Sequence, residues 1–369
     1  MTDATRIPFA ELRPGRDRTD VAQAIDRVLA RGWFVLGPEV EAFEAEFAAA
    51  CGAAHAVGVA SGTDAIALAL RALDVGPGDE VIVPAMTAAF TGLAVASVGA
   101  RPVIVDVDPR TLTIDVAACA AAISPRTRAV VPVHLYGQPA ENAALRAVAE
   151  RHGLAVVEDC CQAHLATEAG VPVGTACAAG AFSFYPTKNL GALGDGGAVV
   201  TNDAAVAARI RRLRNGGQAS RYDHVEPGVN SRLDELQAAV LRVRLQGLAA
   251  ATALRRDLAG TYRRHLGAGV TPIVELDPGH VYHLFPVRLP ERDRLMAFLA
   301  ERGIETLVHY PAPLSAQQAF TRYDPRACPV ASLAAAELLS LPLNPRMSRE
   351  DVIRVADTVN EFSERRGSV

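Results

Sequence analysis

Lys188 is the single lysine of this chain, and every other strongly basic side chain is an arginine. Lysine and arginine total 37 over 369 residues, so the remaining 36 are arginines. Arginine can replace lysine on a solvated surface. It cannot replace an amine that must lose its proton and attack a carbonyl, because guanidinium stays charged. Lys188 is therefore a candidate for imine formation with an aldehyde cofactor and for general-base chemistry. Drift in an arginine-rich coding background is the alternative.

Asp159 is the second candidate, because it follows an apolar run at 154–157 and Glu158. A carboxylate at the end of a buried strand needs a partner. That partner can be a basic side chain in a salt bridge or the amino end of a helix. It can also be a pyridinium ring: at roughly 4 Å and an effective dielectric of about 20, the attraction is ~4 kcal/mol. This equals about three pKa units, enough to keep a ring nitrogen protonated as an electron sink.

The segment Ser61-Gly62-Thr63-Asp64 precedes an apolar helical pattern. Glycine allows a ligand to approach the backbone, and a helix start presents free amides and a positive dipole end, which suits a phosphate. The same Ser-x-x-Asp spacing also makes an ordinary capping box. Ser183, five residues before Lys188, can donate to a phosphate oxygen or simply end a strand.

Short β-branched runs alternate with alanine-rich helical patterns. The alternation predicts an α/β fold: a mostly parallel sheet with helices on both faces. From about residue 250 the pattern changes, so we expect a large cofactor-binding domain over 1–249 and a smaller C-terminal α+β domain over 250–369. Expected strands are 81–83, 103–106, 129–133, 155–158, 181–184, 198–201 and 282–289. Expected helices are 19–31, 39–50, 64–73, 143–152, 204–213, 234–245, 250–266 and 292–302, with one more from 349.

Ligands of open α/β sheets bind beyond the carboxyl ends of the strands. Asp159 ends one expected strand, Lys188 follows another, and Ser61–Thr63 precedes a helix. We therefore expect these residues to gather at one edge of the sheet.

Composition restricts the partners. The net charge is -4 and 21% of residues are charged, with the signs interspersed, which argues against nucleic-acid or acidic-membrane partners. The start, Met1–Arg6, has no apolar signal region, and the uncharged stretch 81–100 suits a strand, turn and helix better than a membrane span. Six cysteines without a C-x-x-C pair indicate reduced thiols and a cytoplasmic protein. The histidines show no metal-ligand spacing, so no metal is expected.

Taken together, these segments resemble the fold-type-I pyridoxal-phosphate enzymes. More narrowly, they resemble the DegT/StrS-type nucleotide-sugar aminotransferases. The resemblance rests on S-G-T-D-A at 61–65, E-D-x-x-Q-A-H at 158–164 and Ser-Phe-x-x-x-Lys-x-Leu-Gly at 183–191. It covers nearly the whole chain, including Gly37–Glu44, Gly76–Pro84, His134–Gly137, Gly228–Ala239 and His309–Pro311. It implies an aspartate-aminotransferase-like large domain.

The resemblance also implies roles for single residues around pyridoxal 5′-phosphate. Lys188 would form the Schiff base, Asp159 would pair with the pyridine nitrogen, and Gln162 would lie beside the ring or its hydroxyl. Gly62, Thr63 and Ser183 would hold the phosphate. Asn230 would reach the phosphate in the neighbouring subunit, which implies a homodimer with shared active sites. Substrate contacts are expected from Tyr185, Arg232 and Tyr310.

The implied activity is a ping-pong transfer of an amino group from L-glutamate to a keto-deoxysugar on a nucleotide, with a lean to 3-keto over 4-keto sugars. Alternatives are an aminocyclitol (inosose) aminotransferase and a non-catalytic regulator that binds the same cofactor. Related sugar dehydratases carry histidine at the lysine position, so Lys188 argues against them.

The chain departs from the family pattern in two places. The family usually has an aromatic residue two positions after the Met86 position, stacked on the cofactor ring; here Ala88 stands there and the aromatic comes at Phe90. Where the family often has Arg-Asn-Tyr/His-Gly, this chain has Arg214-Asn215-Gly216-Gly217. For the first departure, either Phe90 or another side chain covers the ring, or that face is more open; for the second, a substrate-loop contact is expected to be missing or moved. Both departures concern which sugar fits.

Overall fold

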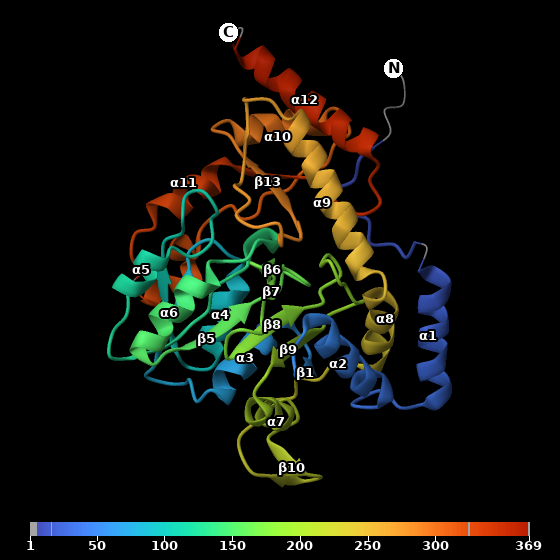
Figure 1. Ribbon diagram of the computed structural model, residues 1–369, viewed down its shortest axis with the longest axis vertical. Helices are drawn as coiled ribbons and strands as arrows, with labels where there is room; N and C mark the ends of the chain where they lie inside the picture. Colours follow the sequence, from blue (N-terminus) through green and yellow to red (C-terminus); the bar gives the residue numbers. More distant parts are fainter. Residues whose placement is uncertain (1–5, 16, 324, 368–369) are drawn as a thin grey trace.

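The computed structural model describes residues 6–15, 17–323 and 325–367 (Figure 1). The segment Met1–Thr5, which carries most of the expectation about a signal region, lies outside the described residues. No helix within the described ranges is both long and apolar enough to cross a membrane. The uncharged stretch 81–100 folds as a strand followed by a helix, as the sequence predicts.

A seven-stranded sheet in the order β1-β9-β8-β5-β4-β2-β3 lies at the centre of the larger part. Neighbouring strands from β3 through β2, β4 and β5 to β8 pair in parallel, while β9 is antiparallel to both β8 and β1. The mostly parallel sheet is therefore confirmed. The strands are β1 (His55–Val59), β2 (Glu80–Pro84), β3 (Arg101–Val105), β4 (Thr127–Val130), β5 (Ala155–Asp159), β8 (Ala179–Ser183) and β9 (Gly197–Thr201).

Helices cover both faces of this sheet, as predicted. In β9, Val199 packs into one hydrophobic core and Val200 into another on the opposite face, because successive strand residues alternate. Apolar residues on both faces explain why β2, β8 and β9 read as continuous apolar runs. The helices are α1 (Arg18–Arg31), α2 (Pro38–Cys51), α3 (Gly62–Ala72), α4 (Ala89–Ser97), α5 (Val116–Ala121), α6 (Asn142–His152), α7 (Ala204–Leu213) and α8 (Glu235–Leu245).

A smaller antiparallel sheet of β12 (Thr271–Pro272), β13 (Phe285–Arg288) and β14 (Leu338–Leu341) lies at the other end of the molecule (Figure 1). Three helices pack against it: α9 (Leu248–His265), α10 (Arg292–Ala300) and α12 (Arg349–Gly367). Ile7 pairs with Ile304 and is buried in this core, so the start of the chain packs with its end. The boundary at 249/250 stays a prediction.

The remaining elements connect the two parts. Helix α11 (Pro329–Glu337) packs into the core of the large sheet through Ala331, Ala334 and Ala335. The hairpin of β10 (Gln218–Ser220) and β11 (Asp223–His224) projects from the large part (Figure 1), whereas the hairpin of β6 (Thr167–Glu168) and β7 (Val171–Pro172) is hydrogen-bonded to the segment 277–279. Short 3₁₀ turns are η1 (Leu135–Gly137), η2 (Leu314–Ala316) and η3 (Gln318–Tyr323).

Candidate functional site

The carboxyl ends of β1, β5 and β8 meet at one edge of the large sheet. Asp159 is the last residue of β5 and Ser183 is the last residue of β8. Ser183 and Val59 both stand opposite Gly197, the first residue of β9. Lys188 follows in the turn directly after β8. The structure thus brings these residues to the edge where the sequence places them.

Backbone segments approach one another closely at Gly62, the first residue of α3. A Cβ atom at Gly62 would lie 2.6 Å from the Ser183 Cβ and 2.7 Å from the Cys161 Sγ. At Gly197, a Cβ atom would lie 2.3 Å from the Ser61 carbonyl oxygen. Side chains do not tolerate such distances, so both positions need glycine. The amino end of α3 is thereby held against the ends of β8 and β9.

Ser61 caps α3, because its Oγ accepts a hydrogen bond from the Asp64 amide at 3.1 Å. The capping interpretation of this motif is therefore correct for Ser61. The cap uses one amide only. The amides of Gly62 and Thr63 are the first two of the helix and have no acceptor in a preceding turn, so they point out of its positive end. Capping and anion binding are compatible at this helix end.

The turn after β8 presents two polar groups beside this helix end. The Ser183 Oγ accepts from the Tyr185 amide (3.3 Å) and so keeps its own proton for another acceptor. The Lys188 amide donates to the Tyr185 carbonyl (2.8 Å). Burial lowers the pKa of Lys188 below its ordinary value, although Cys161 and Asp159 act in the opposite direction. A larger fraction of this amine is therefore unprotonated at neutral pH than of a surface lysine.

Asp159 is a buried carboxylate held by uncharged donors. The Thr91 hydroxyl donates to Oδ2 (2.8 Å) and the Cys161 amide donates to Oδ1 (3.1 Å). The Thr87 hydroxyl lies 3.0 Å from that of Thr91. Because neither donor is charged, the negative charge of Asp159 remains available to a cationic ligand group. Sequence reasoning missed Thr91, whose only signal is a hydroxyl in the first turn of the helix after β2.

The position of the expected stacking residue lies close by. Ala88 immediately precedes α4, and Phe90, within its first turn, leaves 63% of its surface exposed. Phe90 therefore does not fill the interior of its own subunit. Which side chain covers a bound ring stays a prediction.

Gln162 and Tyr310 belong to one hydrogen-bonded group. The Oε1 of Gln162 accepts from the Tyr136 amide (2.6 Å), so its Nε2 donates to the Tyr310 hydroxyl (2.9 Å). The Tyr136 hydroxyl in turn donates to the His309 carbonyl. Burial raises the pKa of Tyr310 above its ordinary value, so this phenol stays protonated. Gln162, which is expected beside the cofactor, is thus hydrogen-bonded to Tyr310, which is expected to contact the substrate.

Three imidazoles lie within electrostatic reach of Lys188, and sequence reasoning gave them no role. Burial lowers the pKa of His164 to about 3, of His309 to about 4, and of His283 well below its ordinary value; the charge of Lys188 adds to each effect. All three rings are neutral at pH 7, so they place no further positive charge beside the amine. The sequence signal of His164 is the Gln-Ala-His segment and that of His309 is the His-Tyr-Pro segment, whereas His283 lies in neither.

Three further predicted residues lie toward the outside of the chain. Asn230 is exposed, Tyr185 is 52% exposed, and Arg232 is partly buried. The Arg232 Nη1 donates to the Asn215 Oδ1 at 3.4 Å, and the backbones of Asn215 and Asn230 form a bridge. The structure therefore does not bury these side chains beside Lys188 in the same subunit.

The unusual glycines at 216 and 217 have a structural reason. Gly216 and Gly217 have φ of 75° and 77°, which favours glycine. A Cβ atom at Gly217 would lie 1.6 Å from the Glu226 carbonyl oxygen. This close contact lets the segment 213–217 pair with 226–231. Gly217 stands at the glycine of the family pattern, so the departure is Gly216, whose positive φ favours glycine over tyrosine or histidine in this turn.

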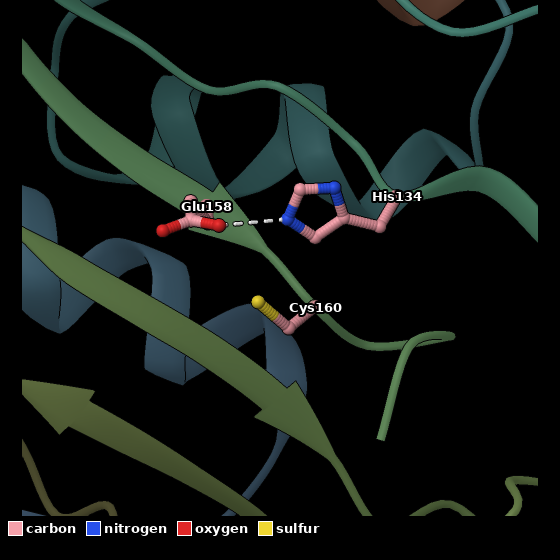
Figure 2. A group of neighbouring side chains, drawn as sticks. All are labelled: His134, Glu158 and Cys160. Atoms are coloured by element: carbon pink, nitrogen blue, oxygen red, sulfur yellow. Dashed lines mark hydrogen bonds and ion pairs between the residues drawn. The ribbon is translucent and has the colours of Figure 1, made fainter. Parts of the chain in front are cut away.

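A buried group of His134, Glu158 and Cys160 has the residue types of a metal site, with ligand atoms within 4.8 Å of one another (Figure 2). The His134 Nδ1 accepts from the Ala140 amide (3.0 Å), so its Nε2 carries the proton and donates to Glu158 (2.9 Å). Burial raises the pKa of the Cys160 thiol well above its ordinary value. With both ring nitrogens in use and the thiol protonated, the group is a His134–Glu158 hydrogen bond beside a buried thiol rather than a set of free ligands.

Comparison with known proteins gives one family. The model of the DegT/DnrJ/EryC1/StrS aminotransferase family matches residues 16–360. A Streptomyces venezuelae protein named dTDP-3-amino-3,4,6-trideoxy-alpha-D-glucose transaminase is 48% identical, with 98% of each chain covered. The erythromycin biosynthesis sensory transduction protein EryC1 of Saccharopolyspora erythraea is 51% identical, covering 96% of this chain and 98% of that one. An Aneurinibacillus thermoaerophilus dTDP-3-amino-3,6-dideoxy-alpha-D-galactopyranose transaminase is 46% identical, covering 96% and 99%.

Solved structures agree with this. S. venezuelae DesV, crystallised in complex with a ketimine intermediate, matches with a TM-score of 0.95 at 48% identity, covering 97% of this chain and 99% of that one. Bacillus subtilis NtdA with bound pyridoxamine phosphate (PMP) matches with a TM-score of 0.92 at 31% identity, covering 98% and 86%.

Proposed function

Because this chain belongs to the DegT/DnrJ/EryC1/StrS aminotransferase family, we propose that it transfers an amino group from L-glutamate to a keto-deoxysugar carried on a nucleotide. Its cofactor is pyridoxal 5′-phosphate. The observation that carries the proposal is the position of the single lysine, beside a buried aspartate and an open helix start at one edge of the sheet.

The residues present fit this cofactor. The free amides of Gly62 and Thr63 and the free proton of Ser183 suit a phosphate. Glycine at position 62 leaves room that a side chain would fill. Asp159, buried and held by neutral donors, suits a protonated ring nitrogen. When bound, pyridoxal phosphate supplies an aldehyde that condenses with amines and a ring that accepts electrons from the substrate carbon.

Each protein group has a defined task in this proposal. Asp159 keeps the ring nitrogen protonated, with an attraction of ~4 kcal/mol at 4 Å and an effective dielectric of about 20. Lys188 holds and moves a proton at its Nζ between donor and acceptor positions. Its lowered pKa suits that task, because a general base must be unprotonated at the working pH. Gln162 is fixed by Tyr136 and Tyr310 and orients the ring edge.

The order of events is ping-pong: glutamate leaves as 2-oxoglutarate before the keto sugar enters the same site. Relatives named for 3-amino sugars support a 3-keto acceptor, and a 4-keto acceptor is the alternative. Exposed Tyr185, partly buried Arg232 and Tyr310 are proposed to contact the sugar nucleotide.

The working unit is proposed to be a homodimer in the cytoplasm, in which Asn230 of one subunit serves the cofactor phosphate of the other. One observation supports this arrangement: Asn230 is exposed in the single chain. The six cysteines form no disulfide within the described residues, which suits a reducing compartment.

Two alternative functions are also put to the test. An aminocyclitol ketone can take the place of the sugar nucleotide, and the name of the S. erythraea relative, a sensory transduction protein, favours a cofactor-binding regulator. Incubation of the holoenzyme with glutamate separates transfer from regulation. We expect the long-wavelength cofactor absorbance to disappear while 2-oxoglutarate is released. An unchanged spectrum would support the regulator.

The acceptor is then identified in a second experiment. The glutamate-treated enzyme is mixed separately with 3-keto and 4-keto nucleotide sugars and with an inosose, and products are assigned by NMR. We expect an amine at carbon 3 of the sugar. Turnover of the inosose alone would favour the aminocyclitol alternative.

A further inference from the structure

Residues Gly228–Arg232, called the arm below, combine an exposed tip with one buried anchor. Val229 is 38% exposed and Asn230 is exposed, but Ser231 between Asn230 and Arg232 is only 1% exposed. A serine so deeply buried within an exposed segment indicates that its hydroxyl is used internally.

Both hydrogen-bonding roles of the Ser231 hydroxyl are assigned by the structure. It donates to the Asp64 Oδ2 at 2.7 Å and accepts from the Ala60 amide at 3.1 Å. The first bond has a charged acceptor, and such bonds are about twice as strong as neutral ones. Ala60 and Asp64 flank the start of α3, so Ser231 ties the arm to the helix end proposed to hold phosphate.

The Asp64 carboxylate is free for this bond. The first turn of α3 is capped by the Ser61 hydroxyl, which binds the Asp64 amide. The Asp64 side chain therefore does not cap its own helix. It is directed to Ser231 of the arm, 167 residues away in sequence.

Backbone bonds hold the arm on its other side. The Ser231 amide donates to the Arg214 carbonyl (2.9 Å), and the Gly216 amide donates to the Val229 carbonyl (2.8 Å). The buried Arg214 binds the Gly58 carbonyl of β1 (2.6 Å). Within the described residues, the backbone of the arm pairs with the segment 213–216, and the Ser231 hydroxyl adds a second attachment, to Ala60 and Asp64.

We propose that Ser231 and Asp64 are positioning residues that set Asn230 for the cofactor site of the partner subunit. The inference rests on the proposed function, in which Asn230 acts across the dimer. Loss of the hydroxyl frees the exposed arm, whereas α3 keeps its Ser61 cap and its packing against β8 and β9. The defect therefore falls on the site of the partner, not on the subunit that carries the change.

The first test measures non-covalent binding of PMP to the full-length apoenzyme. We expect Ser231→Ala to weaken binding by about 10- to 100-fold, the effect of losing a buried hydrogen bond to a charged group. Asp64→Asn, whose amide oxygen still accepts a hydrogen bond, should weaken it less than Asp64→Ala. The matched control is Thr358→Val, which removes a buried hydroxyl from α12 and should leave PMP binding unchanged.

The second test uses hybrid dimers, separated by two affinity tags, in which only one site retains Lys188. In hybrid one, Lys188→Ala is in one subunit and Ser231→Ala in the other, so the remaining lysine faces an intact arm. In hybrid two, both changes are in the same subunit, so the remaining lysine faces the altered arm. Because PMP also binds the site that lacks the lysine, the readout here is the imine absorbance that pyridoxal phosphate gives at the one remaining Lys188 as it is titrated into the apoenzyme. We expect hybrid one to load that site with wild-type affinity and hybrid two to show the full defect.

The opposite pattern, with the defect in hybrid one, would show that Ser231 acts within its own subunit and would overturn the inference. Unchanged PMP binding in the Ser231→Ala homodimer would overturn it as well. Neither result bears on the proposed function. That function fails separately if glutamate does not change the absorbance of the wild-type holoenzyme.

Discussion

Asp159 and Lys188 place a buried acid and a buried amine at the same edge of the sheet, and the difference between them decides the chemistry. Asp159 accepts hydrogen bonds from the Thr91 hydroxyl and the Cys161 amide, neither of which carries a charge. Lys188 has its pKa lowered by burial. In the proposed function, Asp159 holds a proton on the ring of the cofactor by attraction, and Lys188 exchanges a proton with the substrate.

Asp159→Asn preserves the shape of the side chain and removes its charge. We expect kcat to fall about a thousandfold, because the ~4 kcal/mol attraction to a ring cation is lost. Thr91→Val, which removes one neutral donor to the same carboxylate, should lower kcat by about tenfold at most. The measurement is steady-state amino transfer with saturating cofactor. An Asp159→Asn enzyme within tenfold of wild type would exclude the proposed pairing.

His164 gives a prediction for acid stability. Burial lowers its pKa from 6.5 to about 3, and the nearby charge of Lys188 acts in the same direction. Between pH 3 and 6.5 the unfolded chain binds a proton at this ring that the folded chain does not. Its contribution to stability is therefore complete above pH 6.5 and is lost as pH falls, by about 1.4 kcal/mol per pH unit.

His164→Leu should make stability less sensitive to pH between 6.5 and 4. The check is the free energy of unfolding in urea across that range, with His152→Leu on exposed α6 as the matched control. An unchanged pH slope in the His164→Leu variant would show that this ring is protonated in the folded chain.

Sequence reasoning reached some of these residues for a definite physical reason. Asp159 and Lys188 stand just past apolar runs, so the sheet had to bring them to one edge. Thr91 and His164 carry no such mark, because a hydroxyl in a helix and a histidine near aromatics are ordinary core residues. Their neighbours in the folded chain are what separates Thr91 and His164 from other core residues.

At the scale of elements, Glu235 fixes the start of α2. Its buried carboxylate accepts from the amides of Gly37 (3.0 Å), Glu39 (3.0 Å) and Val40 (2.7 Å). A negative charge at a helix amino end is favourable, and here it comes from the first turn of α8. The two helices are thus joined at the base of the large domain.

Glu235→Ala leaves three buried amides without an acceptor. We expect the free energy of unfolding to fall by about 3 kcal/mol or more, with Glu235→Gln intermediate because its amide oxygen still accepts. Thermal unfolding provides the measurement, and Glu41→Ala, at an exposed position in the same turn of α2, is the control. A Glu235→Ala melting temperature equal to that of the control would contradict the capping role.

The elements themselves were predictable where the hydrophobic pattern was long. The expected helix 204–213 coincides with α7, and the strand 198–201 lies within β9. β1 was missed because His55-Ala56-Val57-Gly58-Val59 is short and mixes glycine and alanine with its valines. The antiparallel direction of β9 depends on pairing with distant β1 and β8, which no local pattern records.

At the scale of the whole molecule, exposed apolar side chains gather in the last turn of α1 and in the segment that joins it to α2. Leu29, Trp33, Phe34 and Val35 are 56%, 54%, 46% and 37% exposed. Large apolar groups that remain exposed together favour burial against a partner. We take a second copy of this chain as that partner, in keeping with the proposed dimer.

Light scattering should therefore give twice the 38.8 kDa chain mass. Phe34→Glu should shift the mass toward one chain and reduce activity, because a lone subunit lacks the Asn230 of its partner. Leu333→Glu, a change at an equally exposed leucine of α11, should leave the mass unchanged. A wild-type mass of one chain would refute the shared site.

Long-range packing limited what the sequence could predict at this scale. Ile7 pairs with Ile304 and α11 returns to the core of the large sheet. These contacts join segments far apart in the chain, whereas sequence patterns describe neighbours. The change in pattern near residue 250 does coincide with the start of α9 at Leu248.

The central claim is that Lys188 carries the cofactor, and the presence of one lysine makes the test direct. The holoenzyme is reduced with borohydride and digested with trypsin, and the modified peptide is sequenced by mass spectrometry. We predict a single modified peptide with the cofactor mass on Lys188, and none in a Lys188→Ala control. A modified peptide that lacks Lys188, or an unmodified Lys188 peptide from active holoenzyme, would contradict the account.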